Sequence, residues 1–443
     1  MKLRTRQFLF VLFLLFFVVA APLTVLYTAG YRYSFRAGQI VQTGVFSFTS
    51  VPRGAAIYID DELQSSRTPA VIKNIIPGQH TIRLERTGYS TWQKTLEVQS
   101  HTTTFADGIT LFPLTTPNLA LAFAPDASAT IHKKTDSIAH LKRDDEWTEV
   151  WIYRGGTEQL VSRLPLAPTV PIHIDWSADG TTISLTVGET RPDRLLVSLL
   201  AGTSLDLSDV YRTAESGWWD PRIDGRYFVR TPEGVWDAGY PTGLNSILHK
   251  DLQALTIDND EYIVLQSVED RTAVSIQQAT SVGTLLTYLP RGAYVFAEAP
   301  SWLSLLVEPT RGELILLDRG HSEPIRLTAQ ATAWEWDAGQ NRLLYTDGFE
   351  LHVYDRQNGT NETITRVSDP IIDVAWDTNG ASVFFAQKTN LFAVELDRRD
   401  DRNMTTIISA DNIEHLWTSV DGKNVFVLGT IGGEYGMWKK AIQ

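Results

Sequence analysis

The sequence predicts an all-β protein that begins with one membrane-spanning helix and continues as a small antiparallel β-sandwich and a β-propeller. Three observations predict this. Residues 7–31 carry no charge, the following segment alternates apolar and polar residues, and a strand-plus-turn unit then recurs up to the C-terminus. The expected divisions are a cytoplasmic basic tail at 1–6, a transmembrane signal anchor at 7–30, a linker at 31–43, a sandwich at 44–113 and a propeller at 114–443.

The composition is that of a packed, acidic protein without cysteine. The 443 residues are 43% hydrophobic and include 39 Lys and Arg against 52 Asp and Glu, a net charge of −13. Five of the basic residues and no acid lie in the first 43, so the remainder has 34 against 52, or −18. A surface this negative repels phosphate backbones, and we expect no nucleic-acid partner. The lack of cysteine excludes disulfides, thiolate zinc sites and cysteine nucleophiles.

The apolar run near the N-terminus is long enough to cross a bilayer. Residues 8–29 would extend about 33 Å as a helix. Lys2, Arg4 and Arg6 precede it and should stay in the cytoplasm, which makes a single-pass cell-membrane protein with its bulk extracytoplasmic. A cleaved signal peptide is the alternative, because residues 18–20 form a passable cleavage site. We expect an uncleaved anchor, since the run exceeds the usual apolar core of about 7–15 residues.

Short alternating strands follow this run, separated by Pro, Gly and Asp turns. Strands are expected at 45–48, 56–59, 80–84 and 95–98. Strands this short in a segment of about 70 residues predict a small antiparallel sandwich. Tyr89 and Trp92 should pack in its core, although an exposed platform that stacks on sugars is the alternative reading.

The order of motifs in this segment resembles the PEGA domain family. Arg53 departs from the family pattern, which has Glu there. The resemblance implies a noncatalytic module that is common in bacterial and archaeal envelope proteins, and it implies no ligand. The motifs that carry it are Ser50-Val51-Pro52-Arg53-Gly54-Ala55, Ile57-Tyr58-Ile59-Asp60-Asp61, Thr68-Pro69, Pro77-Gly78-Gln79-His80 and Gly88-Tyr89 with Trp92.

The remaining residues repeat an apolar strand, often ending in Trp, followed by an acidic or Gly turn. A period near 40 residues of strand sequence indicates propeller blades. Eight repeats favour eight blades; seven stays open because the first unit is long, with an apparent insertion at 142–149, and has the weakest turn, at Pro125-Asp126. The last blade should take its fourth strand from residues 110–115. The repeats are anchored at positions 123, 176, 219, 256, 296, 336, 376 and 417.

The repeat resembles the WD40-like and Tol-system propellers of bacterial envelopes in its tryptophans and Ser-x-Asp-Gly turns, as at 177–180 and 419–422. This resemblance implies the fold and a scaffolding habit. Tryptophans at the blade period should be packed between blades: Trp176, Trp219, Trp336, Trp376 and Trp417. The others could form an exposed platform, with core packing as the plainer reading: Trp218, Trp236, Trp302, Trp334 and Trp438.

Catalytic machinery is not evident in the sequence. The nine histidines show no H-E-x-x-H or H-x-H pairing, and no G-x-S-x-G elbow occurs. The acidic run 258–261 lacks the Gly and the distant Glu of a calcium loop, so we expect a solvated turn. We therefore expect no enzyme, no cofactor and no metal site.

The sequence instead favours a membrane-anchored scaffold that contacts an envelope protein or polysaccharide. Its docking face would be built from loops between second and third strands, with ordinary solubilising loops as the plain alternative. A sensor is a third possibility, which the six residues before the apolar run disfavour. The residues expected on the docking face are Arg191, Glu233, Arg271, Arg311, Asp347, Lys388 and Glu434.

A glycan hydrolase or lyase at the cell surface is the competing class. Its carboxylates would lie near the propeller channel, with Asp220 and Glu335 as candidates. Two carboxyl groups about 5–10 Å apart in an apolar-walled pocket would favour that chemistry.

Overall fold

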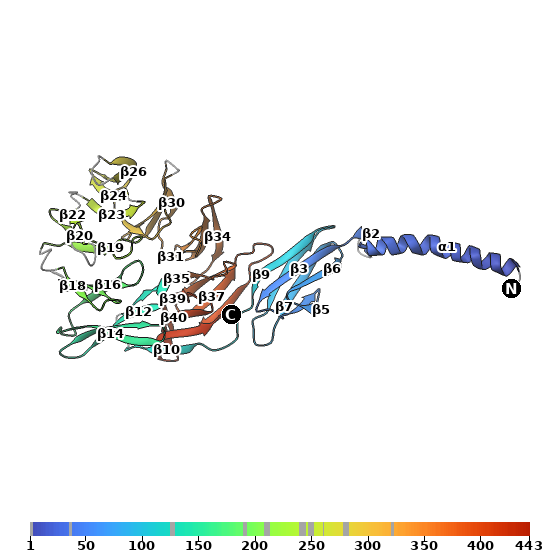
Figure 1. Cartoon of the computed structure of the whole chain (residues 1–443), viewed down its shortest axis with the longest axis horizontal. Coiled ribbons are helices and arrows are strands. Elements are labelled where there is room, and N and C mark those ends of the chain that lie inside the picture. Colours follow the sequence, from blue (N-terminus) through green and yellow to red (C-terminus); the bar gives the residue numbers. More distant parts are fainter. Residues whose placement is uncertain are drawn as a thin grey trace.

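The computed structural model describes residues 3–34, 38–124, 129–188, 193–207, 213–238, 245–246, 252–259, 261–277, 283–319 and 323–443. A long helix projects from one end, a small sandwich lies in the middle, and a ring of small sheets forms the other end (Figure 1). Apart from that helix and a short 3-10 turn, η1 (Lys133–Thr135), the regular elements in the described residues are strands. The all-β expectation with one N-terminal helix is confirmed.

The helix α1 (Leu3–Thr28) includes the segment Arg6–Thr28, in which a stretch of 18 residues has a mean hydropathy of 2.9 and is not buried in the chain. Its length and apolar surface fit a membrane span. Residues 31–43, expected to be a linker, contain a two-stranded hairpin of β1 (Tyr31–Ser34) and β2 (Gln39–Gln42).

The sandwich packs two sheets, with strand orders β6-β3-β9 and β5-β4-β7-β8, around a core that includes Phe46, Ile57 and Leu84. The four expected strands lie within β3, β4, β7 and β8. Strands β5, β6 and β9 were missed, β5 because its sequence ELQSSR shows no apolar alternation. The sandwich is also not antiparallel throughout, as was expected, because β9 pairs with β3 in parallel. The strands are β3 (Gly44–Val51), β4 (Ala56–Ile59), β5 (Glu62–Arg67), β6 (Ala70–Ile75), β7 (Gly78–Glu85), β8 (Trp92–Val98) and β9 (Thr103–Thr110).

Within the described residues, the rest of the chain forms eight four-stranded antiparallel sheets. The first four sheets in chain order are β11 (Ala129–His132), β12 (Ser137–Arg143), β13 (Thr148–Arg154) and β14 (Thr157–Leu164); β15 (Ile172–Trp176), β16 (Thr182–Val187), β17 (Asp193–Ser198) and β18 (Ser204–Asp206); β19 (Ser216–Trp219), β20 (Tyr227–Thr231), β21 (Gly234–Asp237) and β22 (Asn245–Ser246); and β23 (Leu252–Asp258), β24 (Glu261–Val268), β25 (Arg271–Gln277) and β26 (Thr284–Pro290).

The other four sheets complete the propeller. They are β27 (Val295–Ala297), β28 (Leu303–Glu308), β29 (Glu313–Asp318) and β30 (Ile325–Thr328); β31 (Ala333–Trp336), β32 (Arg342–Thr346), β33 (Glu350–Asp355) and β34 (Thr360–Arg366); β35 (Ile371–Trp376), β36 (Ser382–Gln387), β37 (Asn390–Glu395) and β38 (Met404–Ser409); and β39 (Asn412–Thr418), β40 (Asn424–Ile431), β41 (Glu434–Ala441) and β10 (Asn118–Ala122).

Buried apolar clusters join each sheet to the next and the last to the first, so the ring is closed. Leu265 packs in one cluster with Leu306 of the following sheet. Ile138 of the first sheet packs with Trp417 of the last. First strands of several neighbouring sheets contact one another, which places these strands around the central channel.

The ring closes with a different strand from the expected one. The fourth strand of the last sheet is β10 at residues 118–122, not 110–115, and Leu119 pairs with Trp438 of β41. The anchor at Phe123 therefore follows a closing strand, and the first strand of the first sheet is β11, which ends in His132 where most sheets have Trp. The apparent insertion at 142–149 is the β12–β13 hairpin.

A repeated indole hydrogen bond links neighbouring sheets. In four sheets, the Trp that ends the first strand donates from Nε1 to a backbone oxygen in or just after the first strand of the preceding sheet. Such an indole buries a large apolar ring while its N–H still makes a hydrogen bond. This explains why Trp recurs at the blade period. The pairs are Trp176 to Thr130 at 3.4 Å, Trp219 to Asp175 at 3.3 Å, Trp336 to Glu298 at 2.9 Å and Trp376 to Glu335 at 2.9 Å.

Candidate functional site

The propeller has two rims of different character. Successive strands of a sheet run in opposite directions, so the turns between second and third strands gather on one rim, here called the free rim. The turns between first and second and between third and fourth strands gather on the other, here called the bound rim. Six of the residues expected on a docking face lie in or beside free-rim turns, and Arg191 lies outside the described residues. The six are Glu233, Arg271, Arg311, Asp347, Lys388 and Glu434.

These six side chains differ in their exposure to solvent and in whether they are bonded within the protein. Arg271 is 62% exposed and lies 3.7 Å from the exposed Asp270, and Glu233, Lys388 and Glu434 are exposed as well. Four of the six are thus available to an external partner.

Arg311 and Asp347 instead hold their own turns. Arg311 donates to the Arg291 carbonyl at 3.2 Å and to Glu313 at 3.2 Å. Asp347 accepts hydrogen bonds from the Phe349 and Glu350 backbone amides. A position in a turn therefore did not indicate whether a side chain is free or already hydrogen-bonded within its own turn.

A pocket of about 540 Å³ opens at the channel end of the bound rim, among turns of three consecutive sheets. Its lining includes Trp334, Trp336, Trp376 and Glu335. Lys133 reaches it from the first sheet, which is not a neighbour of the sheets that hold Glu335 and Asp373, so its side chain spans the channel.

The Lys133 ammonium lies 3.0 Å from Asp373 and 3.8 Å from Glu335. Burial raises the pKa of Glu335 to about 7, although Lys133 opposes that shift. Burial would raise the pKa of Asp373 too, but the charge of Lys133 with hydrogen bonds from His415 and Leu416 outweighs it and lowers that pKa. Glu335, which lines the pocket, therefore titrates near neutral pH, whereas Asp373, which pairs with Lys133 beside it, stays ionised.

Of the two expected channel carboxylates, Glu335 lines this pocket and Asp220 does not. Asp220 is fully buried and accepts hydrogen bonds from Thr256 at 3.0 Å and from the Ile257 and Arg222 amides at 3.0 and 2.9 Å. A carboxylate saturated in this way holds neighbouring sheets together.

Residue 260 of the acidic run 258–261 lies outside the described residues, and Asp258 and Glu261 are not the solvated acids that we expected. Asp258 is buried and lies 3.3 Å from Arg222 and 3.1 Å from Arg319. Glu261 lies 2.8 Å from Arg319. Two arginines therefore neutralise these acids.

The tryptophans outside the main register do not form a common platform among the described residues. Trp302 is exposed, whereas Trp438 is buried and the remaining three are half-buried. They are spread over four sheets, and Trp334 lines the channel pocket while Trp218 lines a separate one. Core packing is the better description for all but Trp302.

The sandwich meets the propeller through a buried charge cluster. Lys94 has a side chain that is 0% exposed, and its ammonium pairs with Glu395 and donates to the Asp397 carbonyl at 2.7 Å. Trp92 donates from Nε1 to Glu395 at 2.7 Å. Trp92 is thus buried in the core, as expected, and also holds the junction.

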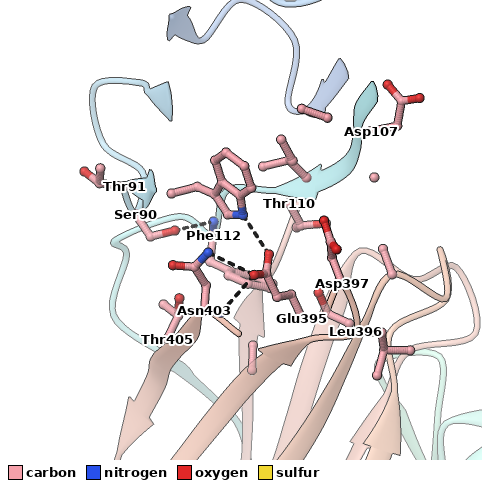
Figure 2. Close-up of a pocket in the computed structure, with 17 residues that line it drawn as sticks. Ser90, Thr91, Asp107, Thr110, Phe112, Glu395, Leu396, Asp397, Asn403 and Thr405 are labelled. Carbon is pink, nitrogen blue, oxygen red and sulfur yellow. Dashed lines mark hydrogen bonds between the residues drawn. The ribbon is translucent and has the colours of Figure 1, made fainter. Parts of the chain in front are cut away.

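A small pocket of about 210 Å³ lies at this junction and is drawn in Figure 2. Asn403, directly before β38, points to Glu395 and donates to it at 3.0 Å. Phe112 packs edge-on against Phe384 at 5.9 Å between ring centroids. Asn379 donates to Thr110 at 2.9 Å. These propeller residues belong to the bound rim or its adjoining strands.

The junction was not predicted from the sequence, although the residues of β8 carry one sign of it. Trp92, Lys94, Leu96 and Val98 alternate onto the buried face of β8. A lysine at a core-facing position of an apolar alternation needs a buried acidic partner. Nothing in the sequence of the sandwich says that this partner lies about 300 residues further along the chain.

Comparison with known families finds one match, in the sandwich. Residues 43–110 match the PEGA domain family. No curated protein matches the chain.

Similar solved structures include Sqt1 of Saccharomyces cerevisiae, at 10% identity and a TM-score of 0.46 over 74% of this chain and all of that one. A chain of a mitotic checkpoint complex matches at 12% identity and a TM-score of 0.44 over 74% and 93%. A eukaryotic initiation factor matches at 10% and 0.47 over 75% and 96%. Likenesses this remote say nothing of function. The sandwich thus belongs to the PEGA domain family, and the larger part of the chain is a β-propeller.

Proposed function

We propose that this chain is a membrane-anchored scaffold whose propeller presents its free rim, outside the cytoplasm, to a protein or an envelope polymer. The observation that carries this proposal is the junction. The buried Lys94 cluster fixes the sandwich to the bound rim, and among the described residues no part of the sandwich covers the free rim. The helix α1, with its exposed apolar surface, supports anchoring through the sandwich.

The chemistry of the free rim suits a polar protein contact. Exposed cationic side chains at Arg271 and Lys388 and exposed acids at Glu233 and Glu434 lie in four different turns of this rim. Charges of both signs in separate turns give a partner orientation and specificity more than raw affinity.

A charge-reversal experiment tests this proposal. The full chain in lipid nanodiscs is used to capture partners from its own envelope fraction, and a variant carries Arg271→Glu, Lys388→Glu and Glu434→Lys. We expect capture to fall at least tenfold, because each reversal places like charges against the partner. A control with Lys423→Glu changes a side chain that is 70% exposed on the bound rim and should capture normally.

Recovery of the same partners by both variants would show that the free rim is not the docking face. Loss of capture by the Lys423→Glu control alone would point to the bound rim instead.

A second candidate function is glycan hydrolysis or lysis in the channel pocket. Glu335, with its pKa near 7, could protonate a leaving oxygen, and Trp336 and Trp376 could face a sugar ring. Asp373 is less suited to act as its partner, because both of its oxygens are engaged, by Lys133 and by the Leu416 amide. Release of reducing ends from envelope glycans, lost in Glu335→Gln, would favour this function.

A further inference from the structure

We propose that Asp347, Glu350 and His352 form a binding site for a divalent metal ion, with zinc as the best-fitting ion. The three lie on the β32–β33 hairpin at the free rim. One ligand atom from each, two carboxylate oxygens and a ring nitrogen, lie within 4.8 Å of one another. Zinc sits about 2.0–2.2 Å from such ligands, so small side-chain rotations would close the three atoms on one ion.

The register of the sheet places the ligands together. Glu350 and His352 are two residues apart on β33 and point to the same face, while Leu351 between them is buried on the other face. Asp347 opens the turn. Gly348 after it has a φ of 99°, which turns the chain back so that the Asp347 carboxylate lies at the start of β33.

His352 is held with one ring nitrogen facing the cluster. Its ring stacks on Tyr345, the residue directly opposite on β32, at 5.0 Å and 17°. On the other side, Thr363 of β34 places its hydroxyl 3.2 Å from Nδ1. Nε2 then faces Glu350 at 3.3 Å. Metal-binding histidines are commonly oriented in this way, with the second nitrogen held by a hydrogen-bond partner.

Each carboxylate also has one oxygen held and one directed to the cluster. Arg366, opposite Glu350 on β34, pairs with Oε1, while Oε2 faces His352. Oδ1 of Asp347 accepts the Phe349 and Glu350 amides at 2.9 and 2.7 Å, and Oδ2 accepts no hydrogen bond from any described residue. One oxygen or nitrogen atom of each of the three side chains therefore remains available to coordinate an ion.

The charge and the donor set select the class of ion. Two carboxylates and a neutral imidazole, with Arg366 beside them, leave a net negative charge that a divalent cation neutralises. One nitrogen and two oxygens suit zinc, whereas calcium and magnesium prefer oxygen alone. The Glu350 and His352 side chains are 21% and 15% exposed, so an ion would be shielded but reachable from solvent. Histidine pairs were the sequence signal that we sought, and this D-x-x-E-x-H set contains only one histidine.

Zinc titration of the full chain in nanodiscs, purified without a histidine tag and stripped of metal, tests the site. We expect one zinc ion per chain by calorimetry at this site and at least a tenfold loss of affinity in Asp347→Asn and in His352→Gln. Thr363→Val should weaken binding about tenfold through the lost orientation of the ring. His173→Gln is the matched control, because His173 is exposed and lies 3.1 Å from a single carboxylate, Asp175.

Thermal unfolding separates loss of the site from loss of the fold. Zinc should raise the melting temperature of the wild type and of His173→Gln but not that of Asp347→Asn, which keeps the turn-capping oxygen. The proposal is overturned if His352→Gln and Asp347→Asn bind zinc as the wild type does. It is also overturned if calcium binds at this hairpin more tightly than zinc, since the histidine would then have no role.

Discussion

The two rims of the propeller differ in where their charges are placed. On the bound rim, Lys94 of the sandwich is fully buried against Glu395 and Asp397. On the free rim, Arg271 pairs at 3.7 Å with an Asp270 that is almost wholly exposed. A buried pair is costly to break and therefore fixes one orientation, whereas an exposed pair is screened and exchanges readily.

This difference explains how the propeller can be fixed to the sandwich at one rim and still accept a partner at the other. The sandwich uses desolvated charge and the Phe112–Phe384 contact to hold a single geometry. On the opposite rim, Arg271, Lys388 and Glu434 stay in water, where they remain available to a partner. The predictions that follow remove these properties one at a time.

The largest effect is expected at Lys94. Lys94→Met removes the cation and leaves Glu395 buried without its charge partner, which should cost about 3–5 kcal/mol of the free energy of unfolding. Calorimetry of the full chain measures this. We expect the junction to loosen, so that the sandwich and the propeller melt in two separate transitions.

The double variant Lys94→Met with Glu395→Gln is the matched control. It removes both charges and keeps one side-chain oxygen, which can accept from Asn403 or from Trp92 but not from both, because these two residues donate to different oxygens of Glu395. Part of the lost stability should return, because no uncompensated charge remains. Equal losses in the single and double variants would contradict the buried-pair account.

One turn of the bound rim begins with an aspartate, Asp377, at a position that serine occupies in two related turns. Ser177 and Ser419 open two turns, and each donates to the Asp two residues later at 2.6 Å. Asp377 occupies that position in a third turn, beneath the sandwich, with Asn379 in place of the Asp. Burial raises the pKa of Asp377 to about 6, against smaller opposing effects of hydrogen bonds from Asn379 and Thr378.

Asp377→Asn should therefore stabilise the protein at alkaline pH. A carboxyl group whose pKa is raised on folding contributes stability at low pH that is lost as pH rises through about 6. At pH 8 the wild type carries that cost, and the variant should be more stable by about 2–3 kcal/mol. Near pH 4 the two should be equal, as measured by denaturant unfolding across pH.

Asp179→Asn should change the stability at pH 8 in the opposite direction. Burial of Asp179 is outweighed by hydrogen bonds from Ser177 and Thr181, which lower its pKa. Its stabilising contribution is present above the unfolded pKa and lost as pH falls, so this variant should be less stable than wild type at pH 8. A shift of the same sign in both variants would rule out the role of burial at Asp377.

Much of the fold could be predicted because its signals are local. Period-two alternation found β3, β4, β7 and β8, and the strand-plus-turn unit found seven of the first strands. The eighth, β11, was missed because the apolar run before Pro125-Asp126, which belongs to the closing strand β10, was assigned to the first repeat instead. In sequence, an apolar strand at the outer edge of a sheet cannot be told from one at the central channel until the strands with which it pairs are known.

The sites were harder to predict because they depend on pairings between distant residues. Turn positions placed Arg271 and Lys388 on the free rim, but nothing local showed that Asp220 is saturated by Thr256 and Ile257. Lys133 meets Asp373 across 240 residues of sequence and a channel. Long-range ion pairs of this kind carry no spacing signature.

The smallest effect is expected at the free rim. Arg271→Ala should change the free energy of unfolding by no more than about 0.5 kcal/mol, because its side chain is 62% exposed and its partner Asp270 is exposed too. Arg311→Ala, on the same rim, should cost more, about 1–2 kcal/mol, since it removes a cation from the buried Glu308 and Glu313 and a hydrogen bond from the Tyr294 hydroxyl. Urea unfolding of the two variants side by side measures this. Equal losses would mean that the turns of the free rim are structural throughout, and the contrast between the rims would then rest on the junction alone.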